Sequence, residues 1–382
     1  MRPHQAPIRR ADGNTECVML LERWLKRAKD HGQMAVVAIV ASDGYSHVAT
    51  DVAGCVELVF PISWGLDTVK QQLRDKSNSK HEEKFTSPNP LSSDRIAYDV
   101  SVGPACYDWI SWLVLAEMNR RRQGGPAPLK VGFRMIDSDE ERVKHARDRE
   151  SFYKRVIFPS LCFVGAVADD ASSDAPALNQ FCMRPLVELC NRGVKVPLLV
   201  PPEEAVESAR NLLYATDRRA PVTITLREVE DRWEFRNSNT QEWIRFARYL
   251  ESTGERVVFI RDTGKASDPI EDFQTCPLAS TDVRVRLAVY EEAKANLFVS
   301  NGPWMLALFG SRPWLMFVET NPMSPFFPET PQFWKEWHGI HHDQFPWSRS
   351  DQRIVWKRDN YETLVDSWEQ LSLQGQMREA AE

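Results

Sequence analysis

The stretch LFVSNGPWMLALFGSRPWLMFVETNP, residues 297–322, determines the fold of the second half of this 382-residue chain. An apolar run opens it, Gly302-Pro303 interrupts that run, and apolar residues 304–309 and 314–318 follow. This pattern predicts a buried strand, a turn, a short helix and a second buried strand, which is the repeating unit of a parallel α/β sheet. Gly302 lets the backbone approach a ligand closely, and Pro303 suits the first turn of a helix. Such a turn directs free N–H groups toward an anion.

The same alternation extends outward from this stretch. We expect strands at 222–227, 256–262, 34–41, 55–62, 95–102 and 129–136, and helices at 241–252, 282–295, 203–214, 105–122 and 361–371. Alternating strands and helices favour parallel, doubly wound sheets. The sequence therefore predicts an α/β protein with two Rossmann-like domains facing a cleft. Prolines 197, 201 and 202 place the boundary between domains 1–205 and 206–382, and the terminal helix is expected to return to the first domain.

Composition narrows the class of protein. The 48 basic and 54 acidic residues give a net charge of −6, which disfavours nucleic acid as a partner. The seven cysteines are scattered, as in a reduced cytoplasmic protein. Residues 1–16 lack the apolar segment of a secretory signal, and the apolar runs are shorter than a membrane span. We expect a cytoplasmic protein, either free or peripheral to the inner face of the membrane.

Common catalytic motifs are absent from the sequence. G-x-G-x-x-G, G-x-x-x-x-G-K-[ST], G-x-S-x-G and H-E-x-x-H do not occur. Dinucleotide oxidoreductases, P-loop enzymes and α/β-hydrolases are disfavoured accordingly.

Two segments of the second half resemble the donor domain of GT-B glycosyltransferases of the heptosyltransferase type. The first is the Ser300-Asn301-Gly302-Pro303 turn with its short helix and the following Gly310-x-x-Pro313. The second is a helix–strand unit whose matching residues are Trp243, Phe246, Ala247, Leu250, Gly254, Val257 and Val258. The resemblance covers residues 222–322. Asn301 is inserted in the family's Thr/Ser-Gly-Pro turn, and the preceding Asp has no counterpart, so the resemblance implies the fold more than the donor.

The resemblance implies a nucleotide-sugar site in the second half. The expected donor-binding residues, which follow strands or lie in the loops after them, are Arg227, Arg236, Asp262, Ser300, Asn301 and Gly302. Open α/β sheets bind ligands at the carboxyl ends of their strands, and a guanidinium suits a diphosphate. The alternative is that Arg227 and Arg236 pair with Glu228, Glu230 or Asp231 at the surface.

Acceptor-side and catalytic residues are expected in the first half. Ser101-Val102-Gly103-Pro104 repeats the strand-to-helix turn, so Ser101, Gly103 and Asp108 are candidates for the acceptor side. The loop after the first strand contains Asp43 and His47, which we expect to supply the catalytic base, with Asp99 and Asp108 as the next candidates. The alternative is that Asp43 starts a turn and His47 a helix.

Two metal signals and one aromatic signal remain. Asp137-Ser138-Asp139 matches the D-x-D of other glycosyltransferases but equally forms a helix cap with Glu141. His338, His341, His342 and Asp343 favour a solvated loop over a zinc site. Trp334, Trp337 and Trp347 fall in the same predicted loop, where they either pack or stack on a base or sugar. We expect no metal and no cofactor.

The sequence thus predicts a metal-independent glycosyltransferase of polysaccharide biosynthesis. Its donor would be a nucleotide-sugar, and its acceptor a glycan, lipid-linked or other glycoconjugate. The alternatives are a nucleotide-sugar epimerase on the same fold and a catalytically inactive sugar- or nucleotide-binding module.

Overall fold

The computed structural model describes residues 37–40, 45–50, 56–61, 95–99, 106–124, 127–134, 152–169, 183–215, 217–229, 236–320, 330–340 and 344–379. The chain forms two compact units, Met1–Thr86 and Ser87–Glu382. The predicted boundary at residue 205 lies inside the second unit, between its last small-sheet strand and the first strand of its large sheet.

The first unit contains an antiparallel sheet. Its strands β1 (Val37–Val40), β2 (Tyr45–Thr50) and β3 (Val56–Pro61) pair in sequence order. The expected parallel arrangement of this segment is wrong, because residues 41–44 are too short a connection for a parallel crossover, which needs about a dozen residues. His47 lies in β2 opposite Ile39, not in a loop or at a helix start.

The second unit begins with a small lobe, residues 95–191, built on a parallel sheet. Its strands are β4 (Arg95–Asp99), β5 (Lys130–Arg134) and β6 (Val167–Ala168), and its helices are α3 (Trp109–Arg122), α5 (Phe158–Ser160) and α6 (Met183–Asn191). The π-helical turn Tyr153–Ile157 and the 3-10 turn Leu161–Val164 flank α5. Helix α3 is buried from Trp109 to Asn119, which explains its almost uniformly apolar sequence.

The large lobe, residues 203–379, carries a six-stranded sheet. Its strands are β7 (Val222–Thr225), β8 (Val257–Ile260), β9 (Gln274–Thr275), β10 (Ala295–Val299), β11 (Trp314–Phe317) and β12 (Gln352–Val355). All five pairings are parallel, and the order is β9-β8-β7-β10-β11-β12. In chain order this is 3-2-1-4-5-6, the arrangement of a Rossmann sheet, whose strand order reverses between β7 and β10. The predicted α/β class with parallel sheets is confirmed in this unit.

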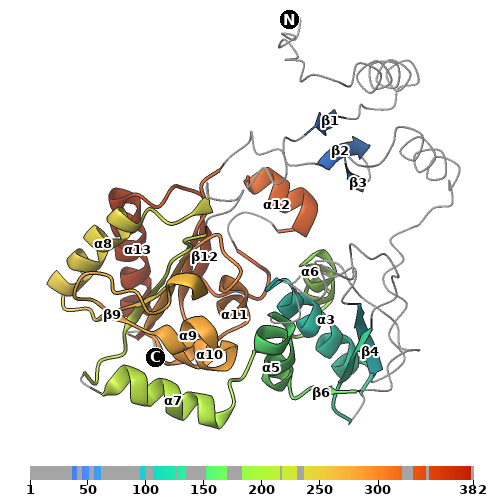
Figure 1. The fold of residues 1–382 in the computed structure, drawn as a ribbon, viewed down its shortest axis with the longest axis horizontal. Coiled ribbons are helices and arrows are strands. Elements are labelled where there is room, and N and C mark those ends of the chain that lie inside the picture. Colours follow the sequence, from blue (N-terminus) through green and yellow to red (C-terminus); the bar gives the residue numbers. More distant parts are fainter. Residues whose placement is uncertain are drawn as a thin grey trace, which may run out of the picture. The chain divides into compact units, whose positions relative to one another are not determined.

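Helices cover both faces of this sheet (Figure 1). They are α7 (Glu203–Tyr214), α8 (Thr240–Ser252), α9 (Pro277–Thr281), α10 (Val283–Glu292), α11 (Trp304–Leu308), α12 (Pro331–His338) and α13 (Tyr361–Glu379). Alternate residues of β8 point to opposite faces of the sheet. Val257 and Phe259 pack with α8 and α13 on one face, and Val258 and Ile260 pack with α9, α10 and α11 on the other. Helix α13 packs along α8, and its return to the first domain stays a prediction.

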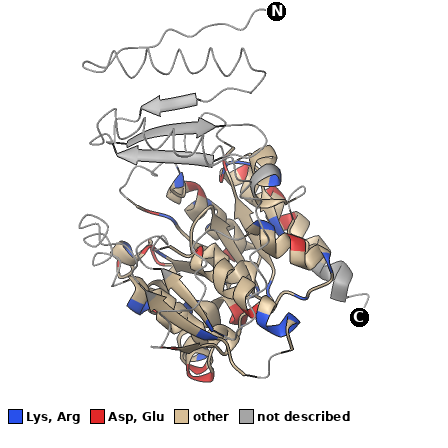
Figure 2. Ribbon diagram, turned by 90° about the vertical axis from the view of Figure 1, so that its right-hand side faces the viewer, with Lys and Arg blue, Asp and Glu red and all other residues tan. Residues whose placement is uncertain are grey.

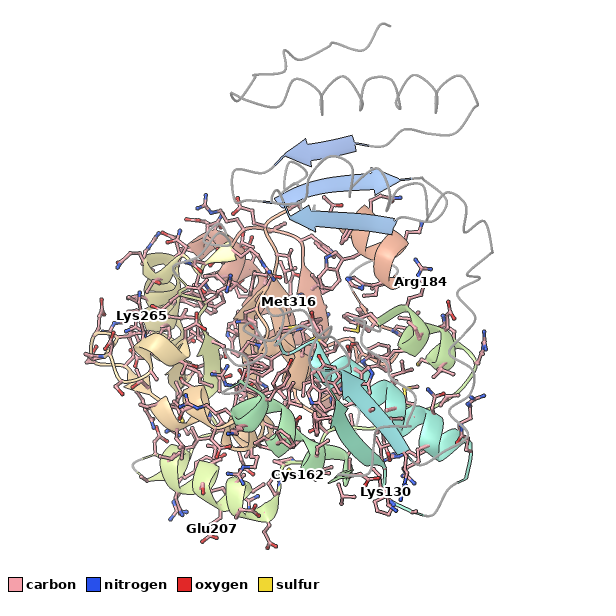
Figure 3. The ribbon with its side chains drawn as sticks, turned by 45° about the vertical axis from the view of Figure 1, so that its right-hand side comes forward. Lys130, Cys162, Arg184, Glu207, Lys265 and Met316 are labelled. Carbon is pink, nitrogen blue, oxygen red and sulfur yellow. The ribbon has the colours of Figure 1, made fainter. Side chains whose placement is uncertain are left out.

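One hydrophobic cluster joins the two lobes of the second unit. It extends from Trp109 and Leu113 of α3 to Trp304 of α11 and Met316 of β11. Figure 3 places Met316 among densely packed side chains, with Glu207 at the rim. The segment that connects the lobes is bound to the large lobe, because the Leu199 N–H donates to the Phe309 carbonyl at 2.9 Å.

On the side drawn in Figure 2, positive and negative residues are interspersed along the helices.

Helix α12 corrects the prediction of a loop around Trp334. Thr330 caps it by accepting from the Phe333 N–H at 3.1 Å, and Pro331 occupies its first turn. Trp334 packs on Trp304, so packing accounts for its ring. His338 is only 5% exposed, and burial lowers its pKa to about 3, so a solvated position is wrong for it.

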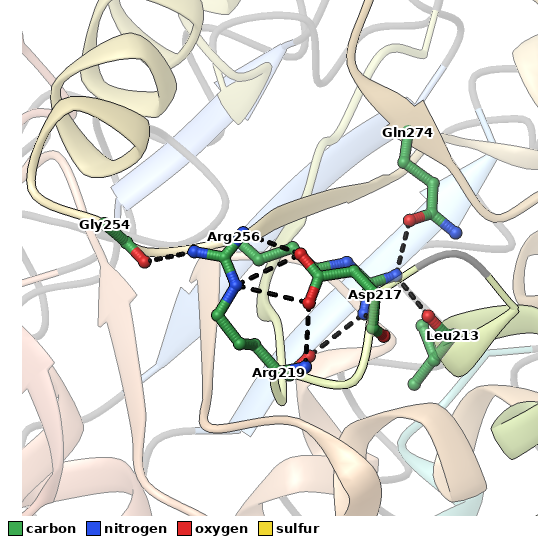
Figure 4. A network of polar contacts seen from close by, with 6 residues as sticks. All are labelled: Leu213, Asp217, Arg219, Gly254, Arg256 and Gln274. Atoms are coloured by element: carbon green, nitrogen blue, oxygen red, sulfur yellow. Dashed lines mark hydrogen bonds and ion pairs between the residues drawn. The ribbon is translucent and has the colours of Figure 1, made fainter.

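A buried arginine holds the amino edge of the large sheet together (Figure 4). Arg256, directly before β8, donates to the carbonyls of Asp217 at 3.2 Å and Arg219 at 3.0 Å, and to Gln274 at 2.6 Å. Arg219 in turn pairs with Asp217 and reaches the Gly254 carbonyl at 2.7 Å. This network fixes the connection into β7 against β8 and β9. Within the described residues, no helix is long and apolar enough to cross a membrane.

Replacing Asp359 by Ala is expected to destabilise the large lobe. The buried Asp359 carboxylate accepts from the Asn239 N–H at 2.8 Å and from the Trp243 indole N–H at 2.7 Å, which fixes the start of α8. Loss of this acceptor leaves two donors unpaired and costs about 1–3 kcal/mol. Urea unfolding measures the loss, with the exposed Asp366→Ala as control. Equal midpoints for both variants contradict the expectation.

His338 is expected to make stability depend on pH. Its pKa is about 3 in the folded chain and near 6.5 when exposed, so the unfolded chain binds the proton first. The contribution of neutral His338 is complete above pH 6.5 and is lost as the pH falls from 6.5 toward 3. His338→Gln should flatten the dependence of the unfolding free energy on pH in this window. Parallel curves for the two proteins would show that His338 is not the titrating group.

Candidate functional site

The carboxyl ends of β7 and β10 form the switch point of the large sheet. The two strands pair in parallel, with Phe298 opposite Thr225, and the chain leaves them in opposite directions. Ligands of open α/β sheets bind at this crevice. Arg227 follows β7 and Ser300 follows β10, so the sheet topology brings together two of the predicted donor-binding residues.

Arg236 reaches this crevice from the loop before α8. Its Nη2 donates to the Ser300 carbonyl at 3.0 Å and to the Ser300 hydroxyl at 2.7 Å. Ser300 is buried, and Arg236 is half-buried. The sequence predicted Arg236 as a donor-binding residue in the same loop as Arg227, and this contact brings its guanidinium to the turn after β10.

The β7–α8 loop is bound to its own strand end. The Arg227 N–H donates to the Ser238 hydroxyl at 2.9 Å, and the Ser238 N–H returns a bond of 2.9 Å to the Arg227 carbonyl. The Asn237 side chain donates to the Val229 carbonyl at 2.7 Å. Arg227 and Arg236 therefore belong to one loop held by internal hydrogen bonds, although they are nine positions apart in sequence.

The alternative of surface pairing is wrong for Glu228. Its carboxylate accepts from Arg261 Nε at 2.9 Å and lies 4.0 Å from Lys265 Nζ, and it is itself nearly buried. Glu228 therefore neutralises cations of the β8 side of the sheet. Glu230 and Asp231 lie outside the described residues.

Asn301 fastens the turn after β10. Its Oδ1 accepts from the Trp304 N–H at 3.0 Å at the start of α11, and its Nδ2 donates to the Thr225 carbonyl at 3.5 Å. The extra residue in the Ser-Asn-Gly-Pro turn thus connects β10 to β7. Accepting a backbone N–H at a helix start is typical of Asn.

Gly302 meets a side chain of the small lobe. A Cβ atom at this position would lie 2.8 Å from Tyr107 Cδ2 and 3.2 Å from Tyr107 Cβ. The sequence predicted that Gly302 admits a ligand to the backbone. In the structure, the close approach that requires glycine is made by Tyr107, which also packs edge-on against Phe152.

Asp108, next to Tyr107, brings a carboxylate to the same place. Burial raises its pKa, while a hydrogen bond from Cys106 and the positive charge of Arg236 oppose that rise. A predicted acceptor-side residue and a predicted donor-side residue therefore interact electrostatically. Ser101, Gly103 and Asp43 lie outside the described residues, as do Asp137 and Asp139.

Sequence reasoning missed a buried arginine beneath the crevice. Arg286 of α10 is 3% exposed and donates to the Ala279 carbonyl. Burial alone would lower its pKa, but Tyr107, Tyr290 and Asp262 reverse this effect and raise the pKa, so Arg286 remains charged. The signal in the sequence was an arginine among the apolar residues of VRVRLAV, 283–289, on a face that must be buried.

Asp262 lies at the end of β8, as predicted, and faces these cations. Its Oδ2 accepts from the Glu228 N–H. Burial raises its pKa, and the Glu228 N–H, Arg286 and Arg227 oppose the rise. Three arginines thus converge with two carboxylates whose pKa values are raised, which gives the crevice a positive balance suited to an anion. Among the described side chains, no three His, Cys, Asp or Glu gather as metal ligands.

Gly302→Ala is expected to destabilise the contact between the lobes. The added methyl group overlaps the Tyr107 ring, and overpacking of this kind costs about 1–3 kcal/mol. Chemical unfolding followed by tryptophan fluorescence measures the loss. Gly264→Ala is the matched control, because its new Cβ meets no atom within 4 Å. If Gly302→Ala unfolds like the control, Gly302 and Tyr107 are not in close contact.

Comparison with known proteins gives matches in structure alone. No protein-family model matches the chain, and no curated protein matches it in sequence. The Escherichia coli ADP-heptose lipopolysaccharide heptosyltransferase II is 11% identical, with a TM-score of 0.46 over 74% of this chain and 99% of that one. A family 9 glycosyl transferase of Veillonella parvula is 12% identical, with a TM-score of 0.43 over 76% and 100%.

A third similar structure is the E. coli heptosyltransferase WaaC with ADP-2-deoxy-2-fluoro heptose. It is 13% identical, with a TM-score of 0.39 over 74% of this chain and 99% of that one.

Proposed function

We propose that this chain is a glycosyltransferase whose nucleotide-sugar donor binds at the switch point between β7 and β10. The observation that carries the proposal is the placement of Arg227 and Arg236 around the Ser300 turn, at the strand ends where open α/β sheets bind ligands. The leaving diphosphate gains negative charge in the transition state, and fixed cations there stabilise it without reorganisation.

We place the catalytic base at Asp108. The acceptor hydroxyl attacks the anomeric carbon, the bond from that carbon to the diphosphate oxygen breaks, and the hydroxyl proton passes to a carboxylate. Asp108 faces Arg236, and burial raises its pKa toward the working range of a base. Asp43 and His47 stay predictions, and the position of His47 inside β2 gives it no strand-end role.

We further propose that transfer needs no divalent ion, because Arg227 and Arg236 supply the positive charge at the diphosphate. The acceptor is expected to be a glycan, a lipid-linked sugar or another glycoconjugate, and the setting polysaccharide biosynthesis. An epimerase would change the sugar of the donor without an acceptor, and a binding module would give no turnover.

Binding and turnover test the proposal separately. In a thermal-shift panel of ADP-, GDP-, UDP-, CDP- and dTDP-sugars, at least one should stabilise the protein. Arg236→Gln should lower the affinity for that nucleotide-sugar about tenfold or more, which is the contribution of a charge-assisted hydrogen bond. Arg210→Gln, an exposed arginine on α7, should not. No stabilisation by any member, or equal losses in both variants, would remove the donor site from the switch point.

Slow hydrolysis of the same nucleotide-sugar in EDTA reports on the base and on metal independence. Asp108→Asn should lose about 10²–10⁴-fold in rate without weaker donor binding. Asp43→Asn and His47→Ala are assayed beside it. If only Asp43→Asn lowers the rate of hydrolysis, the catalytic base lies in the first unit. If hydrolysis requires added manganese, metal independence is wrong.

A further inference from the structure

Two charged side chains, Arg286 and Asp262, hold the chain around Arg227 from both sides. On one side, Arg286 interacts with Tyr290 of the same helix, whose hydroxyl lies 3.0 Å from the Thr225 hydroxyl at the end of β7. On the other side, Asp262 accepts from the Glu228 N–H. Arg227 lies between these two anchored residues, and Leu226 is fixed by its N–H bond of 3.0 Å to the Ile260 carbonyl.

Of these two side chains, Arg286 is buried and remains charged, while Asp262 is half-buried. Arg286 and Tyr290 are 3% and 0% exposed, and burial raises the pKa of Tyr290 to about 12, so its hydroxyl stays protonated. The groups that face Arg286 are Tyr107, Tyr290, Asp262 and the Ala279 carbonyl. The charged groups that face Asp262 are Arg286, Arg227 and Glu228. An arginine taken fully out of water is costly unless its surroundings compensate it.

We infer that Arg286 and Asp262 are positioning residues of the donor site, which hold the β7 strand end so that Arg227 is presented to the diphosphate. This inference rests on the proposed function. Neither residue needs to touch the donor, because each acts through the backbone that carries Arg227. Arg256 holds the opposite edge of the same sheet in a comparable buried network. A variant of Arg256 therefore serves as the control that distinguishes a positioning role from a purely structural one.

The sign of the pH effect follows from the charges around Asp262. Arg286 favours the ionised carboxylate, so removing Arg286 raises the pKa of Asp262 further above its ordinary value. If the ionised form is the one that holds Glu228, donor binding is complete above this pKa and is lost as the pH falls through it. The loss should therefore begin at higher pH in a variant without Arg286.

The test measures the affinity of the wild type and four variants for the nucleotide-sugar of the panel that stabilises the wild type most, from about pH 8 to about pH 4. Arg286→Met should weaken binding about tenfold or more. It should also shift the acid limb, which is the loss of binding as the pH falls, to a pH about one unit or more higher. Arg286→Lys, which keeps the charge, should restore the limb. Asp262→Asn should weaken binding and remove the limb. Arg256→Met should lower the melting temperature with unchanged affinity and limb.

Two outcomes overturn the inference in distinguishable ways. If the wild type binds the nucleotide-sugar while Arg286→Met and Arg256→Met have the same affinity and pH profile, Arg286 is only structural and the proposed function stands. If the wild type binds no nucleotide-sugar, the proposed function and this inference fail together. Should Arg286→Met not fold, Asp262→Asn decides, and wild-type affinity with a wild-type pH profile in that variant overturns the inference.

Discussion

The parallel pairing of β7 with β10 is the constraint on which the site depends. These strands are separated by some seventy residues, yet Ala295 lies opposite Val222 and Phe298 opposite Thr225. Because the strand order reverses at this pair, the loops that leave the two strands diverge and cover opposite faces of the sheet. At the carboxyl ends of this pair, backbone and side chains from β7 and β10 meet at one edge of the sheet.

Hydrogen bonds convert this crevice into a defined cluster of charges. The Ser238, Asn237 and Asn301 side chains each bind backbone groups, and they fasten the two diverging loops to their own strands and to each other. Polar groups buried at a strand end must be paired, and these side chains satisfy that demand locally. Arg227 and Arg236 are consequently presented from a framework that is already formed, as electrostatic stabilisation requires.

The small lobe contributes to the same cluster by contact across one turn. Tyr107 occupies the space that Gly302 leaves, and Asp108 faces Arg236. The shared hydrophobic cluster from α3 to α11 holds this contact in place. A carboxylate of one lobe thereby lies beside the cations of the other, which is the arrangement that transfer between a donor and an acceptor needs.

Sequence alone predicted most elements of the large lobe, but not β9, α9, α12 or β12. The helix over Glu203–Tyr214 has its predicted bounds, and β7, β8, β10, α8 and α11 differ from expectation only near their ends, because apolar runs and their breaks are local signals. Local signals also selected Arg227, Arg236, Asp262 and the Ser300–Gly302 turn as strand-end residues. They failed for β1 and β2, where a short connection forces antiparallel pairing, and for α12, where Pro331 starts a helix.

Only the tertiary structure decided which of these residues meet and what each does. The sequence assigned Gly302 to a ligand, whereas Tyr107, nearly two hundred residues earlier, fills the space before it. It offered Glu228 as a partner for Arg227, whereas Arg261 takes that carboxylate. Arg286 was not selected because its role depends on Asp262 and Tyr107, which lie on two other segments, as well as on Tyr290 of its own helix. Periodicity records which face of an element is buried, but the partner across that face is set by strand order and packing, which no local pattern contains.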